Sequence, residues 1–281
     1  MDGGGLFRRD GRPVSWIHDD FPPLGILEPT TPTRRASSIP SKVDALGLRA
    51  VSSGFSGFLK IKGREAVGKL TQGNRSLTDR IALVTGAGSG MGRATAYVLA
   101  DEGVQVALFD LNEAGLQETV QAIEAAGGRV RGWTVDLAEA GAAERAVEEA
   151  VAHFGGLDIL INNAGISIFT AVDADNYLEI WDKHLSVLLT AQVRMVRAAL
   201  PALRRSDAAR IVNIASTEGL GATPYGSPYT AAKTGVTGLT RSLAVELGPD
   251  GITVNCICPG PIKTGMTAAI SDEHKTILRS G

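Results

Sequence analysis

Three polar side chains in the second half of the chain have the types and the spacing for proton transfer. Tyr229 and Lys233 stand four residues apart in a segment patterned as a helix, so both lie on one helix face. An ammonium group beside a phenol lowers the pKa of the phenol, which can then donate or accept a proton near neutral pH. Ser216 lies thirteen residues before Tyr229, and its hydroxyl can hydrogen-bond a substrate oxygen. The three side chains therefore predict acid–base chemistry at a carbonyl or hydroxyl oxygen.

A glycine-rich turn farther upstream has the composition of a phosphate-binding loop. It follows the apolar residues 80–85, precedes a helical pattern, and comprises Gly86, Ser89, Gly90, Met91 and Gly92. The glycines allow a tight turn and close backbone approach, and the free N–H groups of the helix start face a pyrophosphate. The spacing departs from the common G-x-G-x-x-G pattern because Met91 occupies the last glycine position. This placement predicts a dinucleotide site.

Asp110 ends the second predicted strand, 24 residues after Gly86. A carboxylate there accepts hydrogen bonds from an adenosine ribose and repels a 2′-phosphate, so it favours NAD, with NADP less favoured. Further residues expected around the dinucleotide follow the third and fourth predicted strands: Asp136, Leu137, Asn163, Ala164 and Gly165.

Strands and helices alternate from residue 78 onward. Predicted strands cover residues 80–85, 104–109, 129–135, 157–161, 210–214 and 252–257, and predicted helices cover residues 90–101, 113–126, 139–154, 176–205 and 228–247. Such alternation predicts an α/β fold with a Rossmann-type doubly wound parallel sheet of six strands in one domain, residues 77–281. Residues 1–76 carry repeated prolines, Ser, Thr and Gly, and are predicted to be a disordered N-terminal extension.

Composition excludes several other classes of function. Residues 1–77 have a net charge of +5 against −7 for the rest, but the basic residues are scattered, which argues against nucleic-acid binding. No stretch approaches the roughly 20 apolar residues of a membrane span. Cys256 and Cys258 alternate in a strand pattern without a histidine cluster, so we expect no metal and no disulfide, and interpret both as small buried core residues. A reducing, cytoplasmic location fits that interpretation.

Residues 78–266 resemble the short-chain dehydrogenase/reductase family. The resemblance rests on the glycine turn, residues 162–165 (Asn-Asn-Ala-Gly), the strand that leads to Ser216, the Tyr229-x3-Lys233 pair and residues 259–264 (Pro-Gly-Pro-Ile-Lys-Thr). It implies a nicotinamide cofactor and a hydride passed to or from a carbonyl or hydroxyl carbon. It further implies that Ser216 positions the substrate, that Tyr229 is the acid/base, and that Lys233 binds the nicotinamide ribose. Pro259, Gly260, Ile262 and Thr264 are then expected near the carboxamide, and a homo-oligomer, often a tetramer, is implied.

Two departures from the family pattern stand out. Leu188 occupies the position of an asparagine that helps to hold a water molecule linking the lysine to solvent, which predicts a slower proton relay. The family continues beyond the proline-glycine segment, whereas this chain ends at Gly281. We therefore expect strand 252–257 to be an edge and part of the substrate pocket to be missing; a fragment, a truncated product and a partner-dependent subunit are the open alternatives.

The leading hypothesis is an enzyme that transfers a hydride between NAD(H) and a small-molecule alcohol or ketone. One alternative is a 3-oxoacyl thioester reductase that uses NADPH. The other is a non-catalytic or truncated dinucleotide-binding protein. Glu218 is expected to meet a polar or basic substrate or to sit in solvent, and Ile166, Ile168, Leu220 and Tyr225 are further candidate pocket residues.

Overall fold

Six parallel strands follow one another through residues 77–265, the part of the chain that the computed structural model describes. They are β1 (Ile81–Thr85), β2 (Gln105–Asp110), β3 (Val130–Thr134), β4 (Ile159–Asn162), β5 (Arg210–Ile214) and β6 (Thr253–Ile257). The spatial order is β3-β2-β1-β4-β5-β6, and every neighbouring pair is parallel. The predicted doubly wound sheet is confirmed. Residues 1–76, which were predicted to be a disordered extension, lie outside the described residues, as do residues 266–281.

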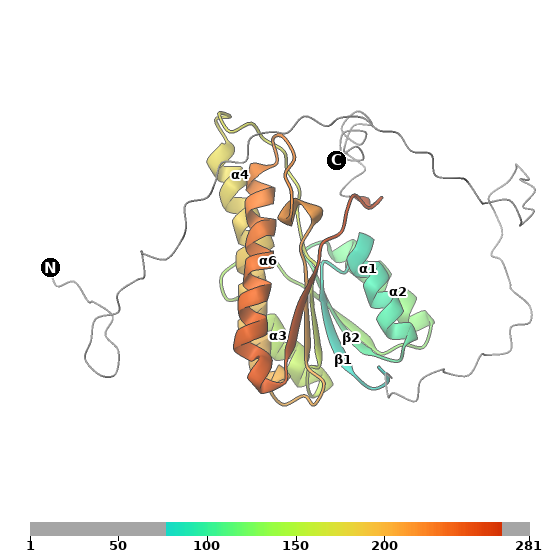
Figure 1. The fold of residues 1–281 in the computed structure, drawn as a ribbon. Helices are drawn as coiled ribbons and strands as arrows, with labels where there is room; N and C mark the ends of the chain where they lie inside the picture. Colours follow the sequence, from blue (N-terminus) through green and yellow to red (C-terminus); the bar gives the residue numbers. More distant parts are fainter. Residues whose placement is uncertain (1–76, 266–281) are drawn as a thin grey trace, which may run out of the picture. The chain divides into compact units, whose positions relative to one another are not determined.

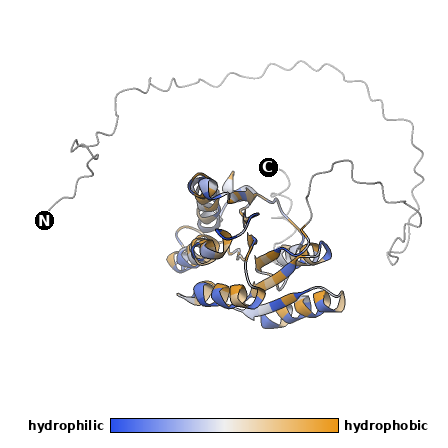
Figure 2. Ribbon diagram, turned by 90° about the horizontal axis from the view of Figure 1, so that it is seen from below, coloured by the Kyte–Doolittle hydropathy of each residue, from blue (hydrophilic) through white to orange (hydrophobic). Residues whose placement is uncertain are grey.

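Helices cover both faces of the sheet (Figure 1). Helices α1 (Gly90–Asp101) and α2 (Glu113–Ala125) pack on one face, and α3 (Ala142–Phe154), α5 (Ala191–Leu203) and α6 (Ser227–Leu247) pack on the other. Each helix contains both hydrophilic and hydrophobic residues, as Figure 2 shows. This composition is expected because each helix turns one apolar side to the strands.

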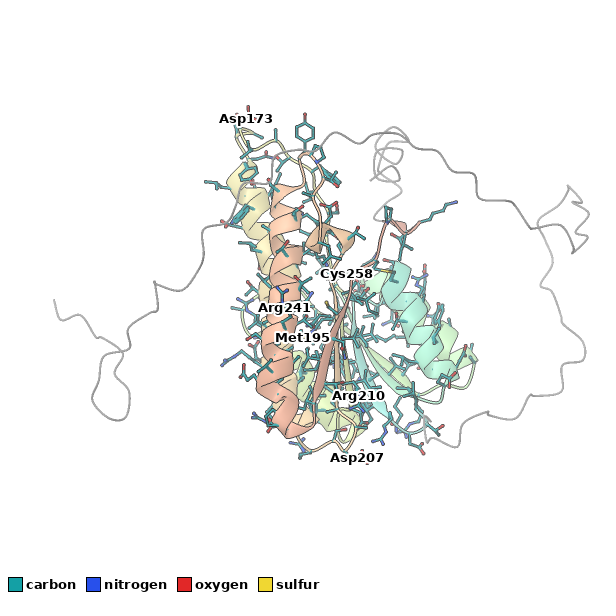
Figure 3. The ribbon with its side chains drawn as sticks, in the orientation of Figure 1. Asp173, Met195, Asp207, Arg210, Arg241 and Cys258 are labelled. Atoms are coloured by element: carbon teal, nitrogen blue, oxygen red, sulfur yellow. The ribbon has the colours of Figure 1, made fainter. Side chains whose placement is uncertain are left out.

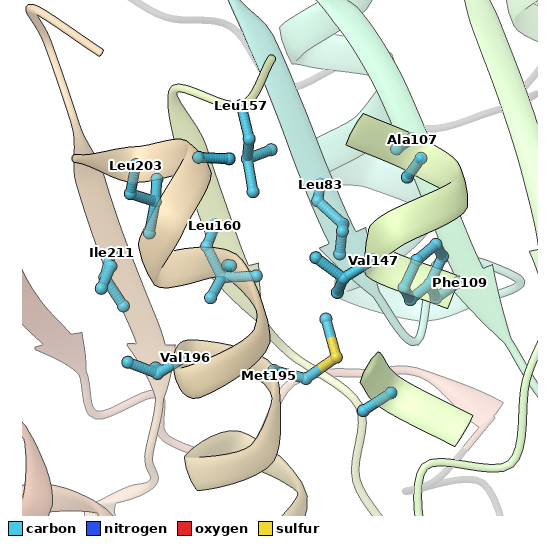
Figure 4. Packing of buried hydrophobic residues seen from close by; sticks show 14 of the residues in the cluster. Leu83, Ala107, Phe109, Val147, Leu157, Leu160, Met195, Val196, Leu203 and Ile211 are labelled. Carbon is cyan, nitrogen blue, oxygen red and sulfur yellow. The ribbon is translucent and has the colours of Figure 1, made fainter. Parts of the chain in front are cut away.

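Two apolar layers, one on each side of the sheet, form the core. On the α3 and α5 side, Met195 packs among Leu160, Val147 and Phe109, all of them buried (Figure 4). On the other side, α1 and α2 cover residues of β1 and β2, including Val84 and Leu108. Strands buried on both faces need apolar residues at every position, which explains the continuous apolar runs in the sequence.

The long helix predicted over residues 176–205 is wrong in its middle. The structure has α4 (Tyr177–His184), a π-helical segment η1 (Leu185–Thr190), and then α5, which carries Pro201 within it. A π segment shifts the hydrogen-bonding register by one residue, and such segments are common at functional sites. Here it packs against α6, the helix that carries Tyr229 and Lys233.

The carboxyl ends of the six parallel strands lie at one end of the sheet. At its centre β1 and β4 are neighbours, and the strand order runs outward from there in opposite directions. Ligands of doubly wound sheets bind at this point. The amino ends of the strands are held together by polar contacts. Arg80 pairs with Asp207 at 2.5 Å, and Ser206 donates a hydrogen bond to Asp158 at 2.5 Å. Figure 3 shows Asp207 and Arg210 at this end of the sheet, away from Cys258.

Candidate active site

The glycine turn between β1 and α1 is shaped by backbone geometry that glycine tolerates best. Gly86 and Gly90 have φ angles of +68° and +52°, in the left-handed region that disfavours side chains. Gly92 is different: a Cβ there would lie 2.0 Å from the carbonyl oxygen of Gly86. The turn and the first turn of α1 are therefore in direct backbone contact.

The start of α1 suits an anion. The Ser89 side chain makes no capping hydrogen bond, and the first turn of α1 carries no acidic residue. The first N–H groups of a helix have no partner within the helix and lie at the positive end of its dipole. The residues present thus fit a pyrophosphate group.

Asn163 fastens the turn to the sheet. Its Nδ2 donates to the carbonyl oxygens of Thr85 at 2.9 Å and Gly86 at 3.2 Å. The Thr85 hydroxyl in turn accepts from the backbone N–H groups of Asn163 at 2.9 Å and Ala164 at 3.0 Å. The Asn163 side chain, which the sequence predicted to lie beside the dinucleotide, thus holds the glycine turn, and Gly165 follows two residues later, after β4.

Asp110, at the carboxyl end of β2, is tied to the same turn. Its Oδ2 accepts from the Gly88 N–H at 2.7 Å, and its Oδ1 accepts from the Asn112 N–H at 2.8 Å. Asp136 follows β3, is exposed, and accepts from the Ala138 N–H at 2.8 Å. Leu137 beside it is buried in the core layer under α3.

Ser216, Tyr229 and Lys233 come together as predicted. Ser216 follows β5 and accepts a hydrogen bond from the Glu218 N–H at 3.2 Å, which leaves its own proton available to donate. Lys233 is buried, with its Nζ 5.6 Å from the centre of the Tyr229 ring and donating to the Ile214 carbonyl at 2.7 Å.

The pKa values of this group are set mainly by burial. Burial raises the pKa of Tyr229, with a further rise from the Glu218 charge, while the hydrogen bond with Ser216 lowers it. Burial lowers the pKa of Lys233 to about 8. The net shift of Tyr229 is thus opposite to the lowered pKa that the sequence predicted for it, because the desolvation of its phenol dominates.

His184 is a buried neighbour of Tyr229 that is not among the site residues predicted from the sequence. Its ring lies 6.1 Å from the Tyr229 ring, nearly perpendicular to it at 87°. Nδ1 bonds the Ile180 carbonyl at 2.8 Å and Nε2 accepts from the Ile168 N–H at 3.2 Å, a pair that fits the neutral ring. Burial lowers its pKa in agreement. A polar residue at the buried end of an amphipathic helix was the signal that could have identified it.

Leu188 lies in η1 and is fully buried. Its side chain offers no polar atom, as the sequence indicated, and the neighbouring segment packs on α6, where Leu189 contacts Gly235. The expected effect on the proton relay stays a prediction.

A cleft that is open to solvent, with an internal volume of about 130 Å³, adjoins Ser216 and Tyr229. Its walls include Met91 of α1 and the segment after β6, with Pro259, Gly260, Ile262 and Thr264. The Pro259 carbonyl accepts from the Thr217 N–H at 3.0 Å. Of the candidate pocket residues, Glu218 lines the cleft, whereas Leu220 and Tyr225 are exposed and are not among its lining residues.

The segment after β6 also reaches the glycine turn. A Cβ on Gly90 would come within 3.3 Å of the Thr264 side chain. Residues 259–264 therefore connect the two halves of the site, the glycine turn and the Ser216–Tyr229 cleft. The expectation that they hold a nicotinamide stays a prediction.

The two cysteines differ from the expectation of buried core residues. Both are free, but each is partly exposed, Cys256 on β6 and Cys258 directly after it. Burial raises the pKa of the Cys256 thiol, and the neighbouring Cys258 raises it further. Their partial exposure fits the place of β6 as the last strand in the order of the described sheet. Among residues 77–265, no cluster of three or more metal-binding side chains occurs.

The fold and site are those of a Rossmann-type oxidoreductase, and comparison with known proteins gives the family. The model of the short chain dehydrogenase family matches residues 80–275. Cyclohexanol dehydrogenase of Acinetobacter sp. (strain SE19) is 38% identical over 73% of this chain and 82% of its own length. D-beta-hydroxybutyrate dehydrogenase of Cupriavidus necator is 38% identical over 67% of this chain and 72% of its own.

A crystal structure from Sinorhizobium meliloti 1021, assigned as a short-chain alcohol dehydrogenase, superposes with a TM-score of 0.67. It is 35% identical and is matched over 72% of this chain and 80% of its own. The chain belongs to the short-chain dehydrogenase/reductase family, whose members are nicotinamide-dependent oxidoreductases acting on small molecules. No helix within residues 77–265 is long and apolar enough to cross a membrane.

Proposed function

We propose that this chain is an NAD-dependent dehydrogenase/reductase that interconverts a secondary alcohol and a ketone, with Tyr229 as the acid/base. The observation that carries the proposal is that Ser216 and Tyr229 line a cleft that also borders α1, with the buried Lys233 beside Tyr229. When bound, a nicotinamide dinucleotide supplies or accepts the hydride.

Each side chain has a role in the direction of ketone reduction. The Ser216 hydroxyl donates a hydrogen bond to the substrate oxygen, because its own oxygen already accepts from the Glu218 N–H. Tyr229 gives its proton to that oxygen as the carbonyl carbon is reduced. Lys233 places a cation 5.6 Å from the Tyr229 ring, which stabilises the phenolate left behind.

The residues around the glycine turn support NAD in preference to NADP. Asp110 holds a carboxylate at the end of β2, fixed by the Gly88 and Asn112 N–H groups. Such a carboxylate accepts hydrogen bonds from ribose hydroxyls and repels a 2′-phosphate. Gly86, Ser89, Gly90, Met91 and Gly92 would hold the pyrophosphate, with Asp136, Leu137, Ala164 and Gly165 toward the adenosine and Ile262 and Thr264 toward the carboxamide.

Two alternative functions each have an observation in their favour. The first is a 3-oxoacyl thioester reductase using NADPH; for its thioester substrate, though not for NADPH, it has the support of a Thauera aromatica relative named as a (2S)-[(R)-hydroxy(phenyl)methyl]succinyl-CoA dehydrogenase subunit, 37% identical over 73% of this chain and 82% of its own. A non-catalytic dinucleotide-binding protein is supported by Leu188, buried where the family has a polar residue. The homo-oligomer and the cytoplasmic location stay predictions, because contacts within one chain do not test them.

The variant Tyr229→Phe separates an enzyme from a binding protein. We expect ketone reduction to fall at least about a hundredfold, because the proton donor is lost, while NADH binding, followed by nicotinamide fluorescence, stays within about twofold of wild type. Unchanged turnover in the variant would overturn the role of Tyr229. Absence of turnover in the wild type, with NADH still bound, would favour the non-catalytic alternative.

A further inference from the structure

Glu218 is the single charged residue among the described residues that line the cleft. It lies in the short 3-10 helix η2 (Thr217–Gly219), two residues after Ser216, and is half-buried. No lysine, arginine or histidine belongs to that described lining. A negative charge on a substrate near Glu218 would therefore meet a like charge, and the described lining residues offer no cation to offset it.

The carboxylate of Glu218 is fixed by hydroxyl groups and is not neutralised by a cation. The Thr230 hydroxyl donates to Oε2 at 2.8 Å, and the Thr223 hydroxyl donates to Oε1. The ion pairs found among residues 77–265 do not include Glu218. Hydroxyl donors stabilise a carboxylate without cancelling its charge.

Glu218 is linked by hydrogen bonds to Ser216 and to the turn of α6 that carries Tyr229. Its backbone N–H donates to Ser216 Oγ at 3.2 Å, and Thr230, which holds Oε2, directly follows Tyr229 on α6. The charge of Glu218 also raises the pKa of the Tyr229 phenol, as expected for a carboxylate close to it.

The rest of the cleft is largely apolar. Met91, Phe169, Pro261 and Ile262 contribute to its walls. Phe169 and Ile262 are 42% and 43% exposed, which leaves apolar surface for a ligand to cover. An apolar substrate body gains from burial there, whereas a carboxylate would lose its hydration beside Glu218.

We propose that Glu218 sets the substrate class of this enzyme, restricting it to apolar ketones and secondary alcohols that carry no negative charge near the reacting carbon. The inference rests on the proposed function. It separates this chain from a hydroxy-acid enzyme such as its hydroxybutyrate dehydrogenase relative and groups it with enzymes of neutral alcohols.

The test compares two ligands of nearly the same shape that differ in charge, acetoacetate and acetoacetamide. Each is added as a competitor to the NADH-dependent reduction of a neutral ketone, chosen from cyclohexanone, acetophenone and their homologues. In the wild type, we expect the amide to compete at a concentration about tenfold lower than the anion, as for like charges a few ångströms apart in a partly solvated site. Glu218→Gln keeps an oxygen and a polar group for the two threonines. In this variant the ratio of the competing concentrations of the anion and the amide should fall below about threefold.

Two controls keep the result specific. Glu246→Gln removes an exposed carboxylate of α6 outside the cleft and should leave the ratio unchanged. Raising the salt concentration should narrow the ratio in the wild type, because ions screen the repulsion; this measurement does not depend on the folding of any variant.

The outcomes distinguish this inference from the proposed function. Equal competition by the two ligands in the wild type, or a full ratio retained in Glu218→Gln, would overturn the role of Glu218 while leaving the enzyme intact. Failure of the wild type to reduce any neutral ketone, with NADH bound, would overturn the proposed function and the inference with it.

Discussion

Replacing Gly92 by alanine tests the packing of the glycine turn. A Cβ at this position would lie 2.0 Å from the Gly86 carbonyl oxygen, 2.7 Å from the Gly86 carbonyl carbon and 2.5 Å from Asn163 Nδ2. Two of these atoms are backbone, so the conflict cannot be relieved by a side-chain rotation. The start of α1 must move away from the turn by about 1 Å to restore ordinary contact distances.

The net effect follows from opposing contributions. Alanine is favoured over glycine within a helix by about 1 kcal/mol. Overpacking a buried site costs about 1–3 kcal/mol, and the Asn163 hydrogen bonds to Thr85 and Gly86 are each worth about 1 kcal/mol. We therefore expect Gly92→Ala to lower the free energy of unfolding by about 2–4 kcal/mol.

Gly238 provides the matched control. It also lies within a helix, α6, but an added Cβ would meet no atom within 4 Å. Gly238→Ala should raise the free energy of unfolding by about 0.5–1 kcal/mol. Urea unfolding of both variants measures stability, and NADH titration measures the site. If Gly92→Ala were as stable as Gly238→Ala and bound NADH like the wild type, the described contact between α1 and the turn would be refuted.

Three further substitutions test other parts of the site. Burial lowers the pKa of Lys233 from 10.5 to about 8, so between these pH values the unfolded chain binds more protons than the folded chain, and wild-type stability should rise with pH. The free energy of unfolding of Lys233→Met, measured in urea, should therefore decline relative to that of the wild type by about 1 kcal/mol per pH unit from about pH 8 to 10. A difference that stays constant with pH would contradict the buried ammonium. Asp110→Asn keeps an acceptor for the Gly88 N–H but removes the charge, so NADPH affinity relative to NADH should rise about tenfold in fluorescence titrations, and an unchanged ratio would argue against its role. Leu188→Asn should raise turnover by restoring a polar group beside the proton relay, and an unchanged or lower rate would count against that relay.

The fold could be predicted from the sequence because its central strands β1, β2 and β4 are buried along nearly all of their length. A continuous apolar run, a turn residue and an amphipathic helix recur in order, and the bounds 210–214 of the fifth strand agree with β5. The parallel sheet then places the carboxyl ends of β1, β4 and β5 at one edge, which brings the glycine turn and Ser216 together without further information.

Other features depend on packing that local patterns do not record. The π segment at Leu185–Thr190 has the same apolar periodicity as a helix, so only its fit against α6 reveals it. The sequence left open whether Glu218 meets a substrate or sits in solvent, and only the contacts with Thr223 and Thr230 show that it is held at the cleft. The roles of Asn163 and His184 likewise depend on their hydrogen-bond partners. Asn163 bonds the turn at Thr85 and Gly86, which is distant in the sequence, and His184 bonds Ile180 in its own helix and Ile168 before it.

The central claim is direct hydride transfer between nicotinamide and a ketone at the cleft of Ser216 and Tyr229. The most direct measurement incubates the 281-residue chain with NADH deuterated at the transferring position and a neutral ketone, and analyses the alcohol by mass spectrometry. The account predicts an alcohol that gains a deuterium atom on its carbinol carbon, together with oxidised cofactor in equal amount. An alcohol without that deuterium, or bound cofactor that is never oxidised, would contradict it.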